Sequence, residues 1–331
     1  MNPTNNGPFL AQAASNTRSA IWPISHEAPS RQLLVTLGLA LAVVGALLAG
    51  PGSAAGAQKK GAGPPALKGV RVVRDLEYVA GGHERNRLDL YLPEKAARPL
   101  PVILWVHGGG WVGGNKTNGP AFRFAAKGYA VASMNYRFSQ HAIFPAQIYD
   151  CKAAVRWLRA NAGKYGLDAD HIGAWGCSAG GHLVALLGTT AGVKELEGPG
   201  GNEDQSSRVQ AVVDWYGPTD FLTVGTKDTR TQLIGGDPQQ NKDKARKASP
   251  MTYVSKDAAP FLIMHGDEDR TVPISQSETF AAALKQAGAD ETYVVVKGGK
   301  HGGALFSSAE TMKQVEDFFA QHLGPPKPAQ P

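Results

Sequence analysis

The sequence predicts an α/β fold with a mostly parallel sheet of eight strands, helices on both faces of the sheet and a small lid. Two observations carry this prediction. Short apolar runs alternate with stretches of helical periodicity over residues 70–323, and repeated strand–helix–strand units require parallel pairing through crossover helices. Most of the runs are apolar throughout, which is typical of strands covered by helices on both faces.

The first two expected strands differ from the rest because they are amphipathic. Residues 72–78 and 87–92 alternate in polarity, with Leu88, Leu90 and Leu92 on one face, and predict an antiparallel start to the sheet. The continuously apolar strands are expected over residues 102–106, 130–135, 172–176, 209–216, 261–265 and 293–296.

Helices are expected between these strands, and two polar stretches interrupt the alternation. The helical segments are residues 148–160, 178–189, 274–286 and 310–323. The polar stretches are residues 192–208 and 222–258, the second of which contains a charged helix that ends near Lys247. We expect both stretches to leave the carboxyl edge of a strand and to border the pocket as a lid.

The composition indicates a folded protein without a nucleic-acid-binding face. Hydrophobic residues make up 42% of the chain, which excludes disorder of the whole chain. The formal net charge of +6 comes from 34 basic and 28 acidic residues spread along the sequence, with no run of five or more like charges. We therefore expect no nucleic-acid partner.

The N-terminal segment predicts export. A polar region is followed by an apolar stretch over residues 33–49 and then by Ala55-Gly56-Ala57, a pattern suited to signal peptidase. We expect residues 1–57 to be an export signal cleaved near Ala57, which makes the protein secreted or periplasmic. If the apolar stretch is retained, it is a membrane anchor instead.

Three further segments complete the predicted organisation. Residues 58–69 are expected to be a linker, residues 70–323 the folded domain, and residues 324–331 a disordered tail. The chain has two cysteines, Cys151 and Cys177, which are interpreted either as two buried thiols or as a pair, and they predict no metal site.

A glycine-flanked serine follows one of the apolar runs. In Gly176-Cys177-Ser178-Ala179-Gly180, a Gly-x-Ser-x-Gly turn between a strand and a helix places the serine on a sharp, strained elbow. Only glycine-sized neighbours let the backbone pass there without collision. The pattern predicts that Ser178 is an exposed nucleophile at a helix N-terminus.

A second glycine-rich segment, His107-Gly108-Gly109-Gly110-Trp111, follows an earlier apolar run. Attack by a serine on an ester carbonyl produces an oxyanion, which backbone N–H groups can stabilise where no side chain obstructs them. We therefore expect Gly109 and Gly110 to bind the negative charge.

A serine nucleophile requires a base and an acid that orients it. His301 follows the last strand in Lys300-His301-Gly302-Gly303, where a glycine-rich loop can carry the imidazole over the serine. His107 and His182 are expected to hold loops by hydrogen bonds, and His265 is expected to be buried.

The acid is expected between the serine and His301, just past a strand. The segment 265–273 contains Asp267 and Asp269, and Asp269 is favoured because the turn at Gly266 uses the first residues to reverse direction. Asp267 is the alternative, as a turn aspartate that binds backbone, and Asp214 and Asp220 are more distant candidates.

Together, four motifs, HGGGW, GCSAGG, HGDEDRTVP and KHGG, resemble the α/β-hydrolase superfamily. Within it, residues 70–323 resemble the hormone-sensitive-lipase-like esterases, and most of all the bifunctional feruloyl and acetyl xylan esterases. This resemblance implies an oxyanion hole made by Gly109, Gly110 and Ala179, and Asp269 as the acid. Cys177 departs from the smaller residues that the family commonly has before the serine.

The predicted function is hydrolysis of short-chain or aromatic esters through an acyl-enzyme on Ser178, with no cofactor. The resemblance and the export signal together imply acetyl or feruloyl esters of plant polysaccharide as substrates. Aromatic residues expected on loops around the pocket are candidates for substrate binding: Trp111, His141, Trp215 and Tyr216. Two alternatives stay open: an amide hydrolase of the arylformamidase or aminopeptidase kind, and a non-catalytic binding protein on the same scaffold.

Overall fold

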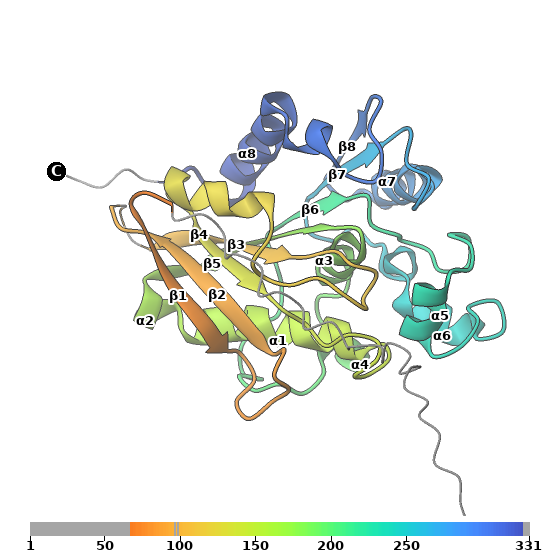
Figure 1. The fold of residues 1–331 in the computed structure, drawn as a ribbon, viewed down its shortest axis with the longest axis horizontal. Helices are drawn as coiled ribbons and strands as arrows, with labels where there is room; N and C mark the ends of the chain where they lie inside the picture. The colour runs from red at the N-terminus through yellow and green to blue at the C-terminus, as the bar shows by residue number, and fades with distance from the viewer. Residues whose placement is uncertain (1–66, 96, 98, 327–331) are drawn as a thin grey trace, which may run out of the picture. The chain divides into compact units, whose positions relative to one another are not determined.

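A computed structural model describes residues 67–95, 97 and 99–326. Its centre is an eight-stranded sheet with the order β1-β2-β4-β3-β5-β6-β7-β8 (Figure 1). β2 is antiparallel to both of its neighbours, and every other pair is parallel. The predicted antiparallel start and the mostly parallel sheet are therefore confirmed.

Each predicted strand forms, with shifts at the ends. The observed bounds are β1 Val70–Glu77, β2 Arg87–Pro93, β3 Leu100–Val106, β4 Ala130–Met134, β5 Leu167–Cys177, β6 Ala211–Trp215, β7 Phe261–Gly266 and β8 Glu291–Val296. Strands β3, β4, β6 and β7 are buried along their whole length, as continuously apolar strands between helical layers must be.

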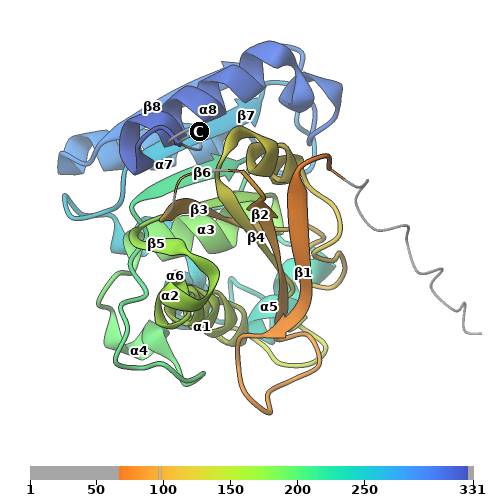
Figure 2. The same cartoon turned by 90° about the vertical axis from the view of Figure 1, so that its left-hand side faces the viewer.

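Two helical layers cover the sheet. α1 (Ala146–Ala160), α3 (Ala179–Thr189) and α7 (Ser275–Ala287) contribute to one hydrophobic cluster, whereas the 3-10 helix η1 (Pro120–Lys127) and α8 (Ala309–Leu323) contribute to the other. Figure 2 shows α1 and α8 on opposite sides of the strands. The smaller helices are α2 Ala162–Tyr165, α4 Lys194–Glu197, α5 Asp228–Ile234, α6 Lys242–Ala248, η2 Pro250–Tyr253 and η3 Ala304–Ser307.

One half of the predicted lid is confirmed and the other half is wrong. Residues 222–258 carry α5 and α6 and contribute Lys227, Thr229 and Arg230 to the cavity that contains Ser178. Residues 192–208 line neither cavity beside the serine. They follow α3, which runs antiparallel to the strands and returns the chain to the amino edge of the sheet, away from the site.

The polar stretch at the amino edge packs against α1 instead. Glu197 of α4 accepts hydrogen bonds from the buried Lys152 at 2.7 Å and from Arg156 at 3.5 Å. Glu197 thus supplies one negative charge to two buried cations, whose remaining donors bind backbone carbonyl oxygens.

The predicted export signal, most of the linker and the end of the tail lie outside the described residues. Within the part of the chain that the structure describes, no helix has the length and apolar character needed to span a bilayer.

Candidate active site

Ser178 stands at the turn between β5 and α3 in a strained backbone conformation, with φ 54° and ψ −120°. Positive φ is uncommon for a residue with a side chain and marks a tightly constrained turn. A Cβ at Gly176 would lie 2.3 Å from the Gly180 carbonyl oxygen, and one at Gly180 would lie 2.0 Å from the Val106 carbonyl oxygen. The two glycines of the motif are therefore required by backbone contact, and they present the serine side chain to the cavity.

The structure brings the three predicted residues together. The Ser178 hydroxyl donates to Nε2 of His301 at 2.8 Å, and Nδ1 of His301 donates to Oδ2 of Asp269 at 2.6 Å. Because a carboxylate can only accept, the proton on His301 lies at Nδ1 and Nε2 is free to take the serine proton. The Asp269 side chain is fully buried, whereas that of His301 is 22% exposed.

Asp269 is ionised because several donors converge on it. Burial raises the pKa of this carboxyl, but contacts with His265 and His301 and hydrogen bonds from the N–H groups of Val272 and Thr271 outweigh burial and hold the pKa well below its usual range. A permanent negative charge at this position favours a positive charge on the adjacent imidazole.

His265 takes part in the site in a way that the sequence analysis missed. It is buried as predicted, but its Nε2 also lies 3.2 Å from Oδ2 of Asp269 and 3.0 Å from the Val272 carbonyl oxygen. Both neighbours are acceptors, so Nε2 carries a proton, and Nδ1 lies 2.7 Å from the Ser277 hydroxyl. His265 is therefore a positioning residue for Asp269, and only its place at the end of β7 pointed to it.

The other candidate acids have different contacts. Asp267 accepts a hydrogen bond from the N–H of Gly298 at 2.7 Å and ties the turn after β7 to the loop that carries His301. Asp214 is buried beneath α3 and Asp220 accepts from the N–H of Leu222. None of the three has a hydrogen bond to His301 within the described ranges.

The glycine-rich loop after β3 presents unused backbone donors. Gly109, Gly110 and Trp111 all have positive φ, and a Cβ at Gly109 would lie 2.3 Å from the Gly113 carbonyl oxygen. Among the described residues, the N–H groups of Gly109, Gly110 and Ala179 donate to no protein acceptor. Free N–H groups on the loop and at the start of α3, beside Ser178, are the donors that an oxyanion needs.

Two buried histidines fix this loop. Nε1 of Trp111 donates to Nδ1 of His182 at 3.2 Å, and Nε2 of His182 lies 2.7 Å from the Ala248 carbonyl oxygen. His107 holds its own end of the loop through the Gly108 carbonyl oxygen at 2.7 Å. Burial lowers the pKa of each histidine to about 4, so both rings are neutral near pH 7. The predicted loop-holding role of these two histidines agrees with these contacts.

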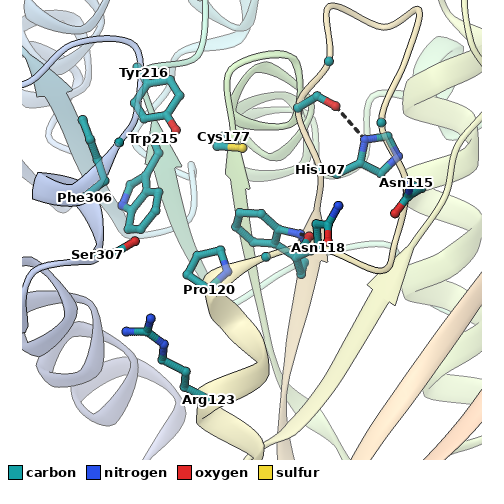
Figure 3. A pocket seen from close by; sticks show the side chains of 16 residues that line it. His107, Asn115, Asn118, Pro120, Arg123, Cys177, Trp215, Tyr216, Phe306 and Ser307 are labelled. Carbon is teal, nitrogen blue, oxygen red and sulfur yellow. Dashed lines mark hydrogen bonds between the residues drawn. The ribbon is translucent and has the colours of Figure 1, made fainter. Parts of the chain in front are cut away.

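Two neighbouring cavities meet beside Cys177 and Tyr216. The first, of about 480 Å³, contains Ser178 and His301, and the second, of about 610 Å³, opens beside it (Figure 3). Four residues line both cavities: Gly108, Gly109, Cys177 and Tyr216. An ester substrate bound at Ser178 can thus place its acyl portion in one cavity and its alcohol portion in the other.

Three of the four predicted aromatic residues lie at these cavities, and one does not. Trp111 lines the first cavity, Trp215 lines the second, and Tyr216 lines both. His141 is not among the residues that line either cavity: its ring stacks on Phe138 and packs on His83, and its Nδ1 accepts from the Phe138 N–H. These local contacts hold His141 on an exposed turn that lines neither cavity.

The cysteines are free thiols in the structure. Cys151 is fully buried, and Cys177 faces the second cavity beside Tyr216 (Figure 3). Burial raises the pKa of Cys177 to about 11, so this residue is a neutral thiol. Of the two interpretations, separate thiols agree with the structure.

Several residues at the cavities were not named by the sequence analysis. Lys227, Arg230 and Thr271 line the first cavity and Arg123 lines the second. The polar stretch 222–258 gave a general signal for the first two, but nothing in the sequence distinguishes Arg123 from other surface arginines. Within the described ranges, no group of three or more His, Cys, Asp or Glu side chains could hold a metal ion.

Comparisons with known proteins agree with this architecture. Residues 88–284, more than half of the chain, match the BD-FAE family. Esterase LipC of Mycobacterium tuberculosis is 33% identical over 260 residues, which cover 74% of this chain and 64% of LipC. The chain thus spans less than two thirds of the length of this curated relative.

Solved structures are similar as well. A truncated form of a carbohydrate esterase from gut microbiota has 35% sequence identity and a TM-score of 0.75, covering 79% of this chain and 99% of that one. A bifunctional GH43-CE protein of Bacteroides eggerthii has 40% identity and a TM-score of 0.73, covering 76% of this chain and 35% of that one. The eight-stranded sheet, the serine elbow and these similarities together show that the chain belongs to the BD-FAE family of α/β-hydrolase esterases.

Proposed function

We propose that this protein is a serine carboxylesterase that hydrolyses its substrate through an acyl-enzyme on Ser178. The observation that carries the proposal is the chain of hydrogen bonds from Ser178 through His301 to Asp269, beside unpaired N–H groups. An esterase requires these elements, and a binding protein has no need to keep all of them together.

The proposed reaction has two similar steps. Nε2 of His301 takes the proton as Oγ of Ser178 attacks the ester carbonyl, and the N–H groups of Gly109, Gly110 and Ala179 stabilise the oxyanion. The C–O bond to the alcohol then breaks, and the alcohol leaves with the proton from His301. Water, activated by the same histidine, attacks the acyl-enzyme, and release of the acid restores Ser178.

The proposed natural substrates are acetyl or feruloyl esters on plant polysaccharide. Support comes from the carbohydrate esterase among the similar structures and from the aromatic side chains of Trp215 and Tyr216 at the second cavity. Aromatic walls suit both a sugar ring and an aryl ring.

The central test compares the wild type with Ser178→Ala on 4-nitrophenyl acetate. We expect the substitution to lower kcat by at least about a thousandfold, because the nucleophile is removed while the oxyanion donors remain. Ser255→Ala, an exposed serine that lines neither cavity, is the matched control and should retain full activity. Circular dichroism shows whether each variant is folded. Turnover by folded Ser178→Ala at the wild-type rate contradicts the proposal.

A second experiment labels the nucleophile covalently and so identifies it directly. Diethyl 4-nitrophenyl phosphate should release one equivalent of 4-nitrophenolate per chain and leave a diethylphosphoryl group on the peptide that contains Ser178. A label on any other residue overturns the assignment of the nucleophile.

The two alternative functions predict different results. An amide hydrolase would cleave N-formylkynurenine or a 4-nitroanilide with a higher kcat/KM than methyl ferulate or acetylated xylan. A binding protein would turn over none of these compounds and would bind one of them without product. Assay of this panel with the wild type separates the three functions.

We also propose that the protein is exported, on the strength of the apolar stretch 33–49 and the Ala55-Gly56-Ala57 pattern. Expression of the full chain in a bacterium, followed by N-terminal sequencing of the exported fraction, should give a chain that begins near Gln58. An intact N-terminus in the membrane fraction would support the anchor instead.

A further inference from the structure

Arg123 is a cation without a partner at the second cavity. It lies on η1 with an exposed side chain, and no hydrogen bond or ion pair to it occurs within the described residues. Figure 3 shows its guanidinium group across the cavity from Cys177, near Ser307. The guanidinium group is a cation, so this end of the cavity carries a positive charge.

The charged side chains that line the two cavities are all positive. Neither cavity is lined by an aspartate or a glutamate, whereas Arg123, Lys227 and Arg230 contribute positive charges. Nζ of Lys227 donates to the Thr271 carbonyl oxygen at 2.7 Å, and Arg230 donates to the carbonyl oxygens of Val224 and Thr271. Of the three cations, Arg123 is therefore the one whose donors are all available to a ligand.

An aromatic wall connects the catalytic histidine with the cavity that contains Arg123. The ring of Tyr216 lies 4.7 Å from that of His301 and 4.6 Å from that of Phe306, and the rings of Phe306 and Trp215 lie 5.3 Å apart. Trp215 and Phe306 line the second cavity together with Arg123. A flat ring that is linked to the reacting ester can follow this wall and carry a further group toward the arginine.

We propose that the second cavity selects esters that carry a carboxylate remote from the ester bond, and that Arg123 binds this carboxylate. The inference rests on the proposed esterase function and adds to it the charge of the preferred substrate. The carboxylate can belong to the alcohol, as in a uronate sugar or a hydroxybenzoate, or to the acyl group, as in a half-ester of a dicarboxylic acid. Both present the same planar anion, which a guanidinium group can bind with two parallel hydrogen bonds.

Two matched pairs of substrates test the proposal. For the alcohol side, 4-acetoxybenzoate is compared with 4-acetoxybenzamide. For the acyl side, 4-nitrophenyl hydrogen adipate is compared with its methyl ester, with release of 4-nitrophenolate as the signal. Each rate is corrected for spontaneous hydrolysis, and kcat/KM is measured at low ionic strength.

We expect the wild type to prefer the anionic member of one pair by about fivefold, the upper range for an exposed ion pair. Arg123→Gln should abolish that preference by lowering kcat/KM for the anion alone, and Arg123→Lys should retain part of it. About 0.5 M NaCl should weaken the preference of the wild type by screening. Arg71→Gln, at an exposed arginine on β1 that lines neither cavity, is the matched control and should change nothing.

The pair that shows the preference identifies the side of the ester that carries the carboxylate. Equal kcat/KM for both members of both pairs, or a preference that Arg123→Gln leaves intact, overturns the inference. In that case, hydrolysis of the neutral substrates still supports the proposed esterase function. If the wild type hydrolyses none of the four substrates, the proposed function fails and this inference fails with it.

Discussion

Acidification from pH 8 to pH 5 should destabilise the fold through two histidines that are buried as neutral rings. Burial lowers the pKa of His107 and His182 to about 4, and the hydrogen bonds to the Gly108 and Ala248 carbonyl oxygens offset only part of this effect. The unfolded chain protonates both residues near pH 6.5. Between pH 6.5 and pH 4 the unfolded state therefore binds more protons, and the free energy of unfolding falls as the pH falls.

Asp214 acts in the opposite direction. Burial raises its pKa to about 6, although one carboxylate oxygen accepts from the Gly217 N–H at 2.9 Å. The second oxygen, Oδ2, is buried without a partner in the described structure. Because the folded state binds this proton more tightly than the unfolded state, acidification from pH 6 toward pH 3.8 restores stability. Asp269, whose pKa is lowered, is ionised at both pH 8 and pH 5 and adds nothing to the difference.

The two histidines outweigh Asp214 in their effect on stability. Relative to pH 8, protonation should lower the free energy of unfolding at pH 5 by about 2 kcal/mol for each histidine and raise it by about 1.5 kcal/mol for Asp214. The net loss of unfolding free energy is then about 2.5 kcal/mol, a large fraction of the stability of an ordinary domain.

Urea denaturation followed by tryptophan fluorescence at the two pH values measures this difference. In His182→Phe the loss between pH 8 and pH 5 should shrink to about 0.5 kcal/mol, and in Asp214→Asn it should grow to about 4 kcal/mol. Each variant is compared with itself, so a change in its absolute stability does not enter the result. A wild type that is equally stable at both pH values, or an unchanged difference in His182→Phe, would show that these histidines do not control the pH dependence of stability.

Two further predictions concern the site. Asp269→Asn should lower kcat by about ten-thousandfold, because the amide no longer orients His301 or stabilises its charged form. Asp267→Asn should leave kcat nearly unchanged. Steady-state kinetics on 4-nitrophenyl acetate measures both variants, and equal losses of kcat would contradict the assignment of Asp269 as the acid. Gly180→Ala should reduce both the melting temperature and kcat, because the new Cβ would lie 2.0 Å from the Val106 carbonyl oxygen. A variant with the melting temperature and kcat of the wild type would show that the backbone at the serine turn can move to accommodate a Cβ.

Much of the fold could be predicted because its determinants are local. Continuous apolar runs mark the strands that lie between two helical layers, and β3, β6 and β7 form close to the expected bounds. β5 begins at Leu167, well before residue 172. This early start was not predicted, because Asp168, Asp170 and His171 are polar and partly or fully exposed and interrupt the apolar signal. Residues 192–208 were placed at the wrong edge, although the predicted helix 178–189 after a parallel strand already implied that the chain returns to the amino edge before them.

Some residues of the candidate site could also be predicted from local sequence, and others could not. Ser178, His301 and Asp269 could be named because each lies next to glycines or a tight turn at a strand end. The contact of His265 with Asp269 could not be predicted, because a histidine at the end of a buried strand gives no sign of what it faces. His141 lines neither cavity, and aromatic character alone does not distinguish a cavity wall from a ring that stacks on its own turn.

Backbone sterics explain the features of this protein that could be read from its sequence. Gly176 and Gly180 permit the elbow, Gly109 and Gly110 free the loop donors, and the alternation of apolar runs with helices requires the parallel sheet. Which side chains meet became clear from the folded chain alone: His301 reaches Ser178 across 123 residues, and Arg123 joins an aromatic wall from another element. The physical reason is that backbone restrictions act between neighbours in the chain, whereas convergence of side chains depends on strand order and on how the helical layers pack on the sheet.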